Sequence, residues 1–363
     1  MKVFFRVDAS KEIGTGHVMR CLTLAETLRS HGATVSFICR EHAGHLCDFI
    51  EAKGFIVSRL PPPTGDAPLS ALTSHSHWLG VPWEIDAEQT KALLQGYTVD
   101  WLMVDHYAIS LEWEHVLKGI AKRIMVIDDL GDRKHDCDLL MDPTALDAPL
   151  KYRSLVPPYC RLFLGPSYVL LRPEFVQQRS HMKHRTGSVK RIFLFFGGFD
   201  PTNETGKALT SFLELNRTDI EVDVVVGQSN LHKQQLKALC DQHDQLHFHC
   251  QINHMALLMR QADIAIGAGG TTTWERCYLG LPSIVWSLAE NQRSMCEYLG
   301  KRGIIHYLGE SHQVKPILLT EQLKAFLADE KERAAMSQRS ADLMKNHSVD
   351  IQLMIKYIIK MGD

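Results

Sequence analysis

A histidine follows two glycines where the first apolar segment of the chain gives way to a helical pattern: Gly14, Thr15, Gly16 and His17. The positive end of a helix disfavours an imidazolium, so we expect His17 to be neutral, and a neutral imidazole can take a proton from water. The sequence therefore predicts a general base. The alternative is a capping or packing histidine, since the chain holds 19 histidines. The third glycine of a dinucleotide fingerprint is absent, so NAD binding is not expected.

A second glycine-rich loop predicts a site for a diphosphate. Gly269 and Gly270 lead into a helical pattern whose first turn carries Thr271, Thr272 and Glu275. Backbone N–H groups between a strand and a helix can approach an anion, and threonine hydroxyls add donors. No Gly-Lys-Ser/Thr closes the loop, so ATP hydrolysis is disfavoured. We expect the Glu275 carboxylate to accept the hydroxyls of a ribose. The alternative is a tight turn with an acidic residue that favours the helix dipole.

Polar residues also follow other predicted strands. Asp8 ends the first strand, and Asp105, His106 and Tyr107 end a later one. Asp8 is a candidate to orient His17 or to hold the attacking water, and the other three are candidates to contact sugar substituents. Capping of the strand ends explains each residue equally well.

Adjacent amides, Asn291 and Gln292, follow a predicted strand at 283–286. Amides at a strand end can recognise hydroxyl and acetamido groups, or they can cap a helix. Two groups of metal-ligand type are His42, His45 and Cys47, and His247, His249 and Cys250. Neither supplies four ligands, so we expect solvated surfaces and no metal.

The order of the elements predicts how these residues are positioned. In the first half, strands are expected at 3–7, 34–39, 101–104 and 124–127, with a helix after His17 that Gly32 ends. In the second half, strands are expected at 192–196, 222–226, 263–266 and 283–286, with helices between them and a helical tail. Parallel strands end at one edge of a sheet, so the polar strand ends should share one rim in each half.

The predicted fold class is α/β, with two Rossmann-like domains facing across a cleft. We expect an N-terminal domain over 1–172, a linker over 173–190, where periodicity is weak, a nucleotide-binding domain over 191–345 and a C-terminal helix over 346–363.

Composition excludes several classes of protein. The chain has 363 residues, a formal net charge of -2 and nine cysteines, with no basic excess suited to nucleic acid. Cys21, Cys39 and Cys277 fall in apolar segments, which is typical of reduced thiols. No window reaches ~18 uninterrupted apolar residues, and the first residues do not resemble a secretory leader. We expect a cytoplasmic protein without a membrane span.

Two N-terminal motifs carry a resemblance to a known family. Arg6-Val7-Asp8-Ala9-Ser10 and Gly14-Thr15-Gly16-His17-Val18-Met19-Arg20-Cys21 resemble the start of UDP-2,4-diacetamido-2,4,6-trideoxy-beta-L-altropyranose hydrolases of pseudaminic acid biosynthesis. The likeness continues through residues 78–80, 86–87, 105–107, 128–129, 132–133, 164–168, 171–173, 196–201, 269–275 and 291–292. The stretch through Cys21 is the most specific part, whereas glycosyltransferases share the later glycine loop.

The resemblance implies a GT-B fold and a step that supplies flagellin glycosylation. Water would attack the anomeric carbon of the UDP-sugar with inversion, releasing UDP and the free trideoxy sugar, with His17 as the base. Glu275 would hold the ribose, residues 269–272 the diphosphate, and Asn291 the sugar or β-phosphate. The substrate-binding set that we expect comprises Asp8, Gly14, Gly16, Arg20, Asp105, His106, Tyr107, Gly198, Gly269, Gly270, Thr271, Thr272, Glu275, Asn291 and Gln292.

Two other functions remain open at this point. An inverting glycosyltransferase would use the same donor site but a different acceptor, and a nucleotide-sugar-binding protein would keep the pocket without catalysis. We expect a monomer that needs no cofactor, whose only partner is the small-molecule UDP-sugar. The residues by themselves indicate a nucleotide diphosphate; only the resemblance specifies the sugar.

Overall fold

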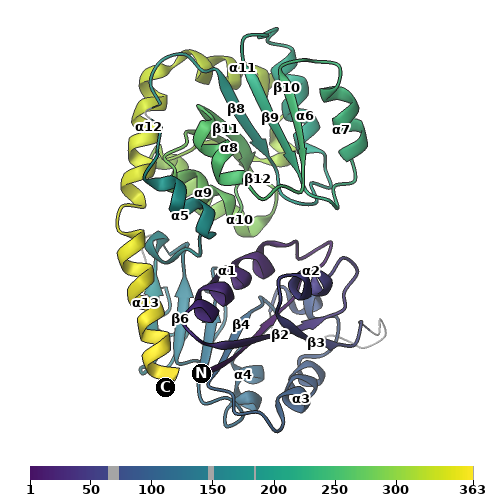
Figure 1. Ribbon diagram of the computed structural model, residues 1–363, viewed down its shortest axis with the longest axis vertical. Helices are drawn as coiled ribbons and strands as arrows, with labels where there is room; N and C mark the ends of the chain where they lie inside the picture. The colour runs from purple at the N-terminus through teal and green to yellow at the C-terminus, as the bar shows by residue number, and fades with distance from the viewer. Residues whose placement is uncertain (64–72, 146–150, 184, 363) are drawn as a thin grey trace. The chain divides into compact units, whose positions relative to one another are not determined.

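The computed structural model describes residues 1–63, 73–145, 151–183 and 185–362. Contacts divide the chain into two compact units. The first comprises Met1–Leu170 together with Asn346–Asp363, and the second comprises Leu171–Lys345. Each unit has its own parallel sheet (Figure 1).

The first unit is built on a seven-stranded sheet in the order β3-β2-β1-β4-β5-β6-β7. Its strands are β1 Lys2–Val7, β2 Thr34–Arg40, β3 Ile56–Leu60, β4 Trp101–Asp105, β5 Ile124–Ile127, β6 Leu139–Asp142 and β7 Arg161–Leu164. All neighbouring strands pair in parallel. Side chains of β1 alternate between two apolar clusters, with Val3 and Phe5 in one and Phe4 in the other, so both faces of the sheet are covered.

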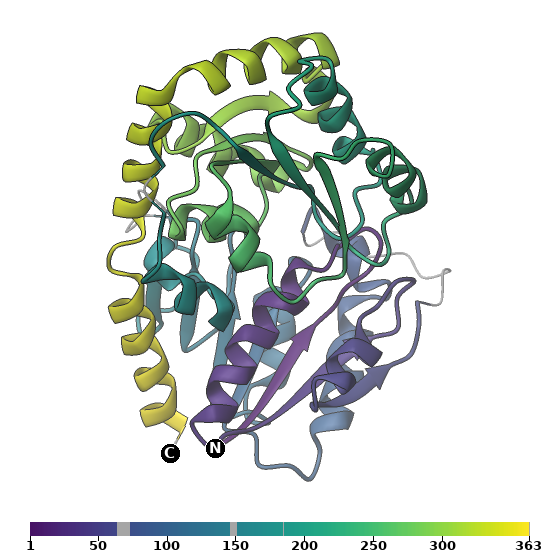
Figure 2. The same ribbon diagram turned by 45° about the horizontal axis from the view of Figure 1, so that its top comes forward.

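Helices cover this sheet on both faces. They are α1 Gly16–Ser30, α2 Cys47–Ala52, α3 Trp83–Leu94, α4 Leu111–Leu117 and α13 His347–Gly362, with short 3-10 turns at Ser76–Leu79 and Pro166–Tyr168. In Figure 2 the purple helix α1 runs alongside β1 and β2, with which it is in contact. The first turn of α1 therefore lies next to the carboxyl end of β1.

The C-terminal helix α13 belongs to the first unit although it ends the chain. The indole nitrogen of Trp101 donates to the carbonyl of Ile358 at 3.1 Å. Gly362 lies against Met1 and Trp101, and Figure 1 shows the two termini close together. Helix α13 thus packs as an integral part of the first unit.

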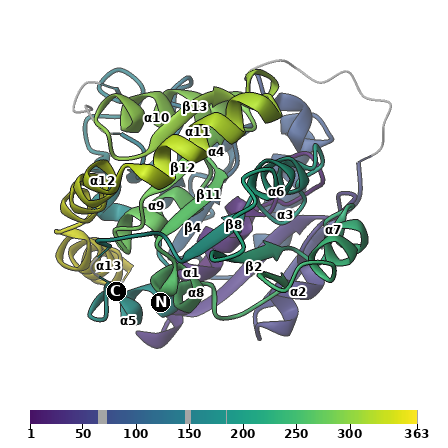
Figure 3. The same ribbon diagram turned by 90° about the horizontal axis from the view of Figure 1, so that it is seen from above.

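The second unit has a six-stranded parallel sheet in the order β10-β9-β8-β11-β12-β13. Its strands are β8 Arg191–Phe195, β9 Glu221–Val226, β10 Leu246–Cys250, β11 Ile264–Ala268, β12 Ser283–Ser287 and β13 His306–Glu310. Its helices are α5 Pro173–Arg179, α6 Glu204–Leu213, α7 Lys233–Cys240, α8 Met255–Gln261, α9 Thr272–Tyr278, α10 Glu290–Lys301, α11 Pro316–Ala328 and α12 Glu330–Leu343, with a 3-10 turn at Ser311–Gln313. Helices α6 and α11 pack against each other (Figure 3), whereas α8 and α9 contact β8 and β11.

The stretch 173–190 differs from the linker that the sequence predicts. It begins with α5, whose first residue is Pro173, and α5 packs against α8 and α9. Proline at the first helical position is well tolerated, because its missing N–H would have no partner there. The first seven residues of this stretch therefore form a short helix of the second unit.

Both sheets confirm the predicted fold class of two Rossmann-like domains. Each sheet contains the strand order 3-2-1-4-5-6 when its strands are counted within its own unit. The order reverses between β1 and β4 in the first unit and between β8 and β11 in the second. Ligands of such sheets bind beyond the carboxyl ends of the strands at that reversal. Within the described residues, no helix combines the length and the apolar character that crossing a membrane requires.

Candidate active site

His17 and Asp105 form a buried pair at the strand reversal of the first unit. Strand β1 pairs with β4, with Val7 opposite Asp105, and this pairing places the end of β4 beside the first turn of α1. Nδ1 of His17 lies 2.6 Å from a carboxylate oxygen of Asp105. Both residues are buried, with 7% of His17 and 1% of Asp105 exposed. Asp105 therefore fixes the orientation of the imidazole ring.

Arg20 binds the same carboxylate from the next turn of α1. Its Nε and one terminal nitrogen donate to the two oxygens of Asp105 at 2.6 Å each, and its other terminal nitrogen donates to Asp129 at 2.9 Å. Burial acts to raise the pKa of Asp105, but the charge of Arg20 and the hydrogen bonds from Arg20 and His17 outweigh it and hold this pKa well below its ordinary value. Asp105 is therefore ionised, and both of its oxygens are occupied by protein groups rather than open to a sugar.

Asp8 does not orient His17, contrary to one of the roles that the sequence suggests. Its two oxygens accept from the Arg6 guanidinium at 2.6 and 2.8 Å, and one of them also accepts from the backbone N–H of Arg40 at 2.7 Å. Nε2 of His106 lies 3.3 Å from Asp8, and neither residue is more than 2% exposed. Asp8 is thus part of a buried ion-pair network.

His106 and Tyr107 occupy different environments. His106 accepts from the backbone N–H of Ala108 at 3.1 Å through Nδ1, and burial lowers its pKa despite the nearby carboxylate of Asp8. The ring of Tyr107 packs edge-on to His17, with 4.6 Å between centroids, and stacks on Trp78 at 5.3 Å. Both aromatic rings therefore pack edge-on against the His17 ring.

The loop before His17 is held by its own backbone. The N–H of Gly14 donates to the carbonyl of Ser10 at 2.9 Å, and Gly14 has a positive φ of 77° that favours glycine. Helix α1 begins at Gly16, so His17 lies in the first turn, where backbone N–H groups have no helical acceptor.

Gly269 lies close to helix α10, so a larger residue there would need its neighbour to shift. A Cβ at Gly269 would lie 2.2 Å from the sulfur of Cys296 in α10, whereas the atom nearest to a Cβ at Gly270 would be Nε2 of Gln292, 3.8 Å away. The Gly269 N–H donates to the carbonyl of Trp286 in β12 at 3.1 Å. Thr271 and Thr272 follow at the start of α9.

Glu275 has one paired and one unpaired carboxylate oxygen. Oε1 accepts from Nε of Arg172 at 3.0 Å, while Oε2 is buried without a hydrogen-bond partner among the described residues. Arg172 also pairs with Glu174 at 2.8 Å and lies over the ring of Phe175. A buried, unpaired carboxylate oxygen requires an explanation, and a hydroxyl donor from a ligand would satisfy it.

The amide pair is also placed beside the glycine loop. The side-chain oxygen of Gln292 accepts from the backbone N–H of Leu288 at 2.9 Å, and its Nε2 lies near Gly270. Asn291 precedes it in the first turn of α10.

The loops that follow β8 and β9 lie against each other at Gly198, another of the expected site residues. A Cβ at Gly227 would lie 2.4 Å from the carbonyl oxygen of Gly198.

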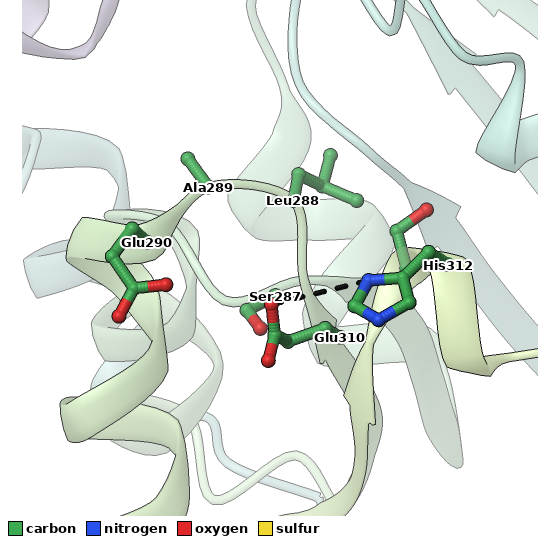
Figure 4. Close-up of a pocket in the computed structure, with 7 residues that line it drawn as sticks. Ser287, Leu288, Ala289, Glu290, Glu310 and His312 are labelled. Carbon is green, nitrogen blue, oxygen red and sulfur yellow. Dashed lines mark ion pairs between the residues drawn. The ribbon is translucent and has the colours of Figure 1, made fainter.

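A cavity of about 230 Å³ opens beyond the ends of β12 and β13 (Figure 4). Ser287, Leu288, Ala289, Glu290, Glu310, Ser311 and His312 line it. None of the expected site residues is among them. Two glutamates would repel phosphates, so this cavity is unsuited to a diphosphate.

The two histidine–cysteine groups can be compared with their surroundings in the structure. Among the described residues, no group of three or more histidine, cysteine or acidic side chains is arranged to hold a metal ion. His249 instead pairs with Asp223 at 2.9 Å. The expectation of a solvated surface is wrong for His42, which is buried 3.5 Å from Asp8, and for Cys47, which is fully buried. The buried carboxylate of Asp8 draws His42 inward.

Comparison with known proteins supports the resemblance that the motifs indicate. Residues 191–352 match the model of the glycosyltransferase family 28 C-terminal domain. The chain is similar to the UDP-2,4-diacetamido-2,4,6-trideoxy-beta-L-altropyranose hydrolase of Campylobacter jejuni. The two are 27% identical over 304 residues, which cover 84% of this chain and 97% of that enzyme.

Two further relatives have similar identity. The spore coat polysaccharide biosynthesis protein SpsG of Bacillus subtilis is 25% identical over 337 residues, covering 90% of this chain and 89% of SpsG. An uncharacterized protein of Methanocaldococcus jannaschii is 26% identical over 314 residues; the match spans 84% of this chain but only 60% of that protein.

Solved structures identify the fold as GT-B. UGT71G1 of Medicago truncatula, complexed with UDP-glucose, aligns with a TM-score of 0.65 at 14% identity over 100% of this chain and 98% of the other. MurG of Acinetobacter baumannii aligns with a TM-score of 0.60 at 14% identity over 99% of each chain. The GT-B fold that the sequence predicts is confirmed.

From the sequence, Asp105 and Arg20 are expected to contact the ligand. Arg172 has no individual role there. Arg20 follows His17 by three residues on α1, and this helical spacing could have indicated that the two side chains lie together. The Arg172–Glu275 pair joins residues 103 positions apart, and no local pattern signals such a contact.

Proposed function

We propose that this protein is an enzyme acting on a nucleotide-sugar, and specifically that it hydrolyses UDP-2,4-diacetamido-2,4,6-trideoxy-beta-L-altropyranose. The products are UDP and 2,4-diacetamido-2,4,6-trideoxy-L-altrose, formed with inversion at the anomeric carbon. The observation that carries the proposal is the buried His17–Asp105 pair, with 2.6 Å between Nδ1 and the carboxylate. The similarity to the Campylobacter jejuni hydrolase supports the choice of substrate.

The pair is suited to general base catalysis. A carboxylate can only accept hydrogen bonds, so Nδ1 of a neutral His17 carries the proton and Nε2 keeps its lone pair. Nε2 makes no hydrogen bond to any residue that the structure describes. We propose that Nε2 accepts the proton of the attacking water. The water oxygen forms a bond to the anomeric carbon while the bond from that carbon to the β-phosphate oxygen breaks.

The second unit supplies the nucleotide site in this proposal. Gly269, Gly270 and the hydroxyls of Thr271 and Thr272 bind the diphosphate, whose charge grows as UDP leaves. Oε2 of Glu275, buried and unpaired in the described structure, accepts a ribose hydroxyl. Asn291 and Gln292 contact the sugar or the β-phosphate.

A second candidate, an inverting UDP-sugar glycosyltransferase, has its own support. Residues 191–352 match a glycosyltransferase domain, and the GT-B fold is common to such enzymes. The two reactions share the donor site and differ in whether water or a hydroxyl of an acceptor attacks the sugar. A non-catalytic nucleotide-sugar-binding protein would need no oriented base.

Incubation with the UDP-sugar, without acceptor and with EDTA, distinguishes these functions. NMR follows the release of UDP and the anomer of the free sugar. Prompt release with inversion is the expected result. Binding of UDP without release of sugar would reject hydrolysis, and release that needs an added acceptor would identify a transferase.

A further inference from the structure

Arg276 is a fully buried arginine that pairs with no carboxylate in the described part of the chain. Its exposed fraction is 0%. One terminal nitrogen donates to the carbonyl of Ala268 at 2.8 Å and to the hydroxyl of Thr273 at 2.9 Å. Nε and the other terminal nitrogen have no partner among the described residues. Burial lowers the pKa of Arg276 to about 10, so the side chain stays protonated at neutral pH.

The guanidinium lies directly behind the glycine loop. Ala268 is the last residue of β11 and precedes Gly269, and Thr273 lies in the first turn of α9. A Cβ at Gly267 would lie 2.4 Å from the carbonyl oxygen of Phe195 in β8 and 2.6 Å from the unpaired terminal nitrogen of Arg276. The absence of a side chain at Gly267 therefore makes room for this cation at the carboxyl end of β11.

A second buried arginine of the same unit shows a different arrangement. Arg185 is 6% exposed, and burial lowers its pKa to about 10 as well. Its guanidinium donates to the carbonyls of Lys183, Met259, Ala262, Leu279 and Gly280. Arg185 thus satisfies backbone acceptors around the start of β11, whereas Arg276 leaves donors unused next to the loop.

An unpaired buried charge is unfavourable unless something compensates for it. An anion bound at the glycine loop would do so, since charges interact strongly where water is excluded. We propose that Arg276 is a positioning residue that holds a fixed positive charge behind the loop and so makes the site select a diphosphate over an uncharged nucleoside. The inference rests on the proposed function in one respect, that the loop binds the diphosphate of UDP.

Affinities of the full chain for UDP, UMP and uridine, measured by calorimetry or ligand-observed NMR, test the inference. Arg276→Met should weaken UDP binding by about tenfold or more and leave uridine within about twofold, with UMP between them. Arg276→Lys, which keeps the charge, should retain most of the preference for UDP. Arg185→Met is the matched control: it should lower the unfolding temperature but not the ratio of UDP to uridine affinity.

Uridine binding by Arg276→Met shows that this variant is folded. The same two affinities, for UDP and for uridine, are compared in Arg276→Lys, which retains the charge. An unchanged UDP-to-uridine ratio in Arg276→Met, or an equal loss for both ligands, would overturn the inference and indicate a purely structural role. An equal fall in the ratio of UDP to uridine affinity in Arg276→Lys and in Arg276→Met would also overturn the inference. A wild-type chain that binds no UDP would contradict the proposed function, and the inference with it.

Discussion

Nδ1 of His17 lies 2.6 Å from a carboxylate oxygen of Asp105, a residue 88 positions later in the chain. The contact exists because β1 and β4 are neighbours in the sheet, so the end of β4 reaches the first turn of α1. Arg20 binds the same carboxylate with two hydrogen bonds. Asp105 is thereby fixed on both sides, and it fixes the ring of His17 in turn.

Asp105→Asn should lower kcat by about 10²- to 10⁴-fold. An asparagine amide can donate to Nδ1, which would favour the imidazole tautomer that carries its proton on Nε2 and cannot accept one from water there. UDP affinity should stay within about twofold, because the second unit is proposed to hold the nucleotide. Steady-state kinetics and calorimetry provide both quantities.

Asp132→Asn is the control for this substitution. Asp132 is a more exposed carboxylate that pairs with Arg133 and is not assigned a part in catalysis. Its removal should leave kcat within about twofold. Equal losses in the two variants would mean that Asp105 contributes through net charge rather than through the orientation of His17.

Stability should depend on pH through Asp105. Although burial opposes it, the charge of Arg20 and the hydrogen bonds that Arg20 and His17 donate hold the pKa of Asp105 below its ordinary value. A carboxyl with a depressed pKa stabilises the folded state fully above its unfolded pKa, about 3.9, and loses this contribution as pH falls toward the folded pKa.

The difference in unfolding free energy between the wild type and Asp105→Asn should therefore be constant between about pH 6 and 8 and shrink below about pH 4. Urea denaturation at several pH values measures it. A difference that widens on acidification would contradict the sign of this linkage.

Arg172→Met and Glu275→Gln should each weaken UDP binding. A hydrogen bond to a charged group contributes about 1.5–3 kcal/mol, which corresponds to about 10- to 100-fold in affinity. Because Arg172 acts through Glu275, the double variant should bind UDP about as weakly as Glu275→Gln alone. Arg217→Ala, on an exposed ion pair of the same unit, is the control. Additive losses in the double variant would show that Arg172 acts independently of Glu275.

Gly269→Ala should destabilise the second unit by about 1–3 kcal/mol, because the new methyl group would lie 2.2 Å from the buried sulfur of Cys296. Gly270→Ala has the space for its methyl group and should cost less than about 1 kcal/mol. Replacing Cys296 with alanine in the Gly269→Ala background should recover part of the loss. Thermal unfolding of the three variants ranks them, and equal effects at the two glycines would refute the steric argument.

The central strands could be predicted from the sequence, and the edge strands could not. Strands β1, β2, β4 and β5 are apolar runs because both of their faces are buried. The edge strands β3, β7, β10 and β13 are half exposed, so their sequences mix polar and apolar residues and were not predicted. Strand β6 was also missed; it is buried but has only four residues.

The candidate site shows the same division between local and long-range signals. Glycine loops next to strand ends are local, so His17 and Gly269 could be placed from sequence. Most partners of Asp8 could not be predicted. Arg6 lies only two positions away in the sequence, but His42 and His106 come close to Asp8 only because of the order of the strands in the sheet. The buried ion-pair network around Asp8 therefore could not be predicted from the sequence.

The central claim is that water attacks the anomeric carbon and that His17 takes its proton. Hydrolysis of the UDP-sugar in ¹⁸O-labelled water, with mass spectrometry of the UDP, tests it most directly in the wild type and in His17→Ala. The account predicts UDP without ¹⁸O, and a rate that falls by about 10²- to 10⁴-fold in the variant. Label in the β-phosphate, which would place the attack at phosphorus, or an undiminished rate in His17→Ala would contradict it.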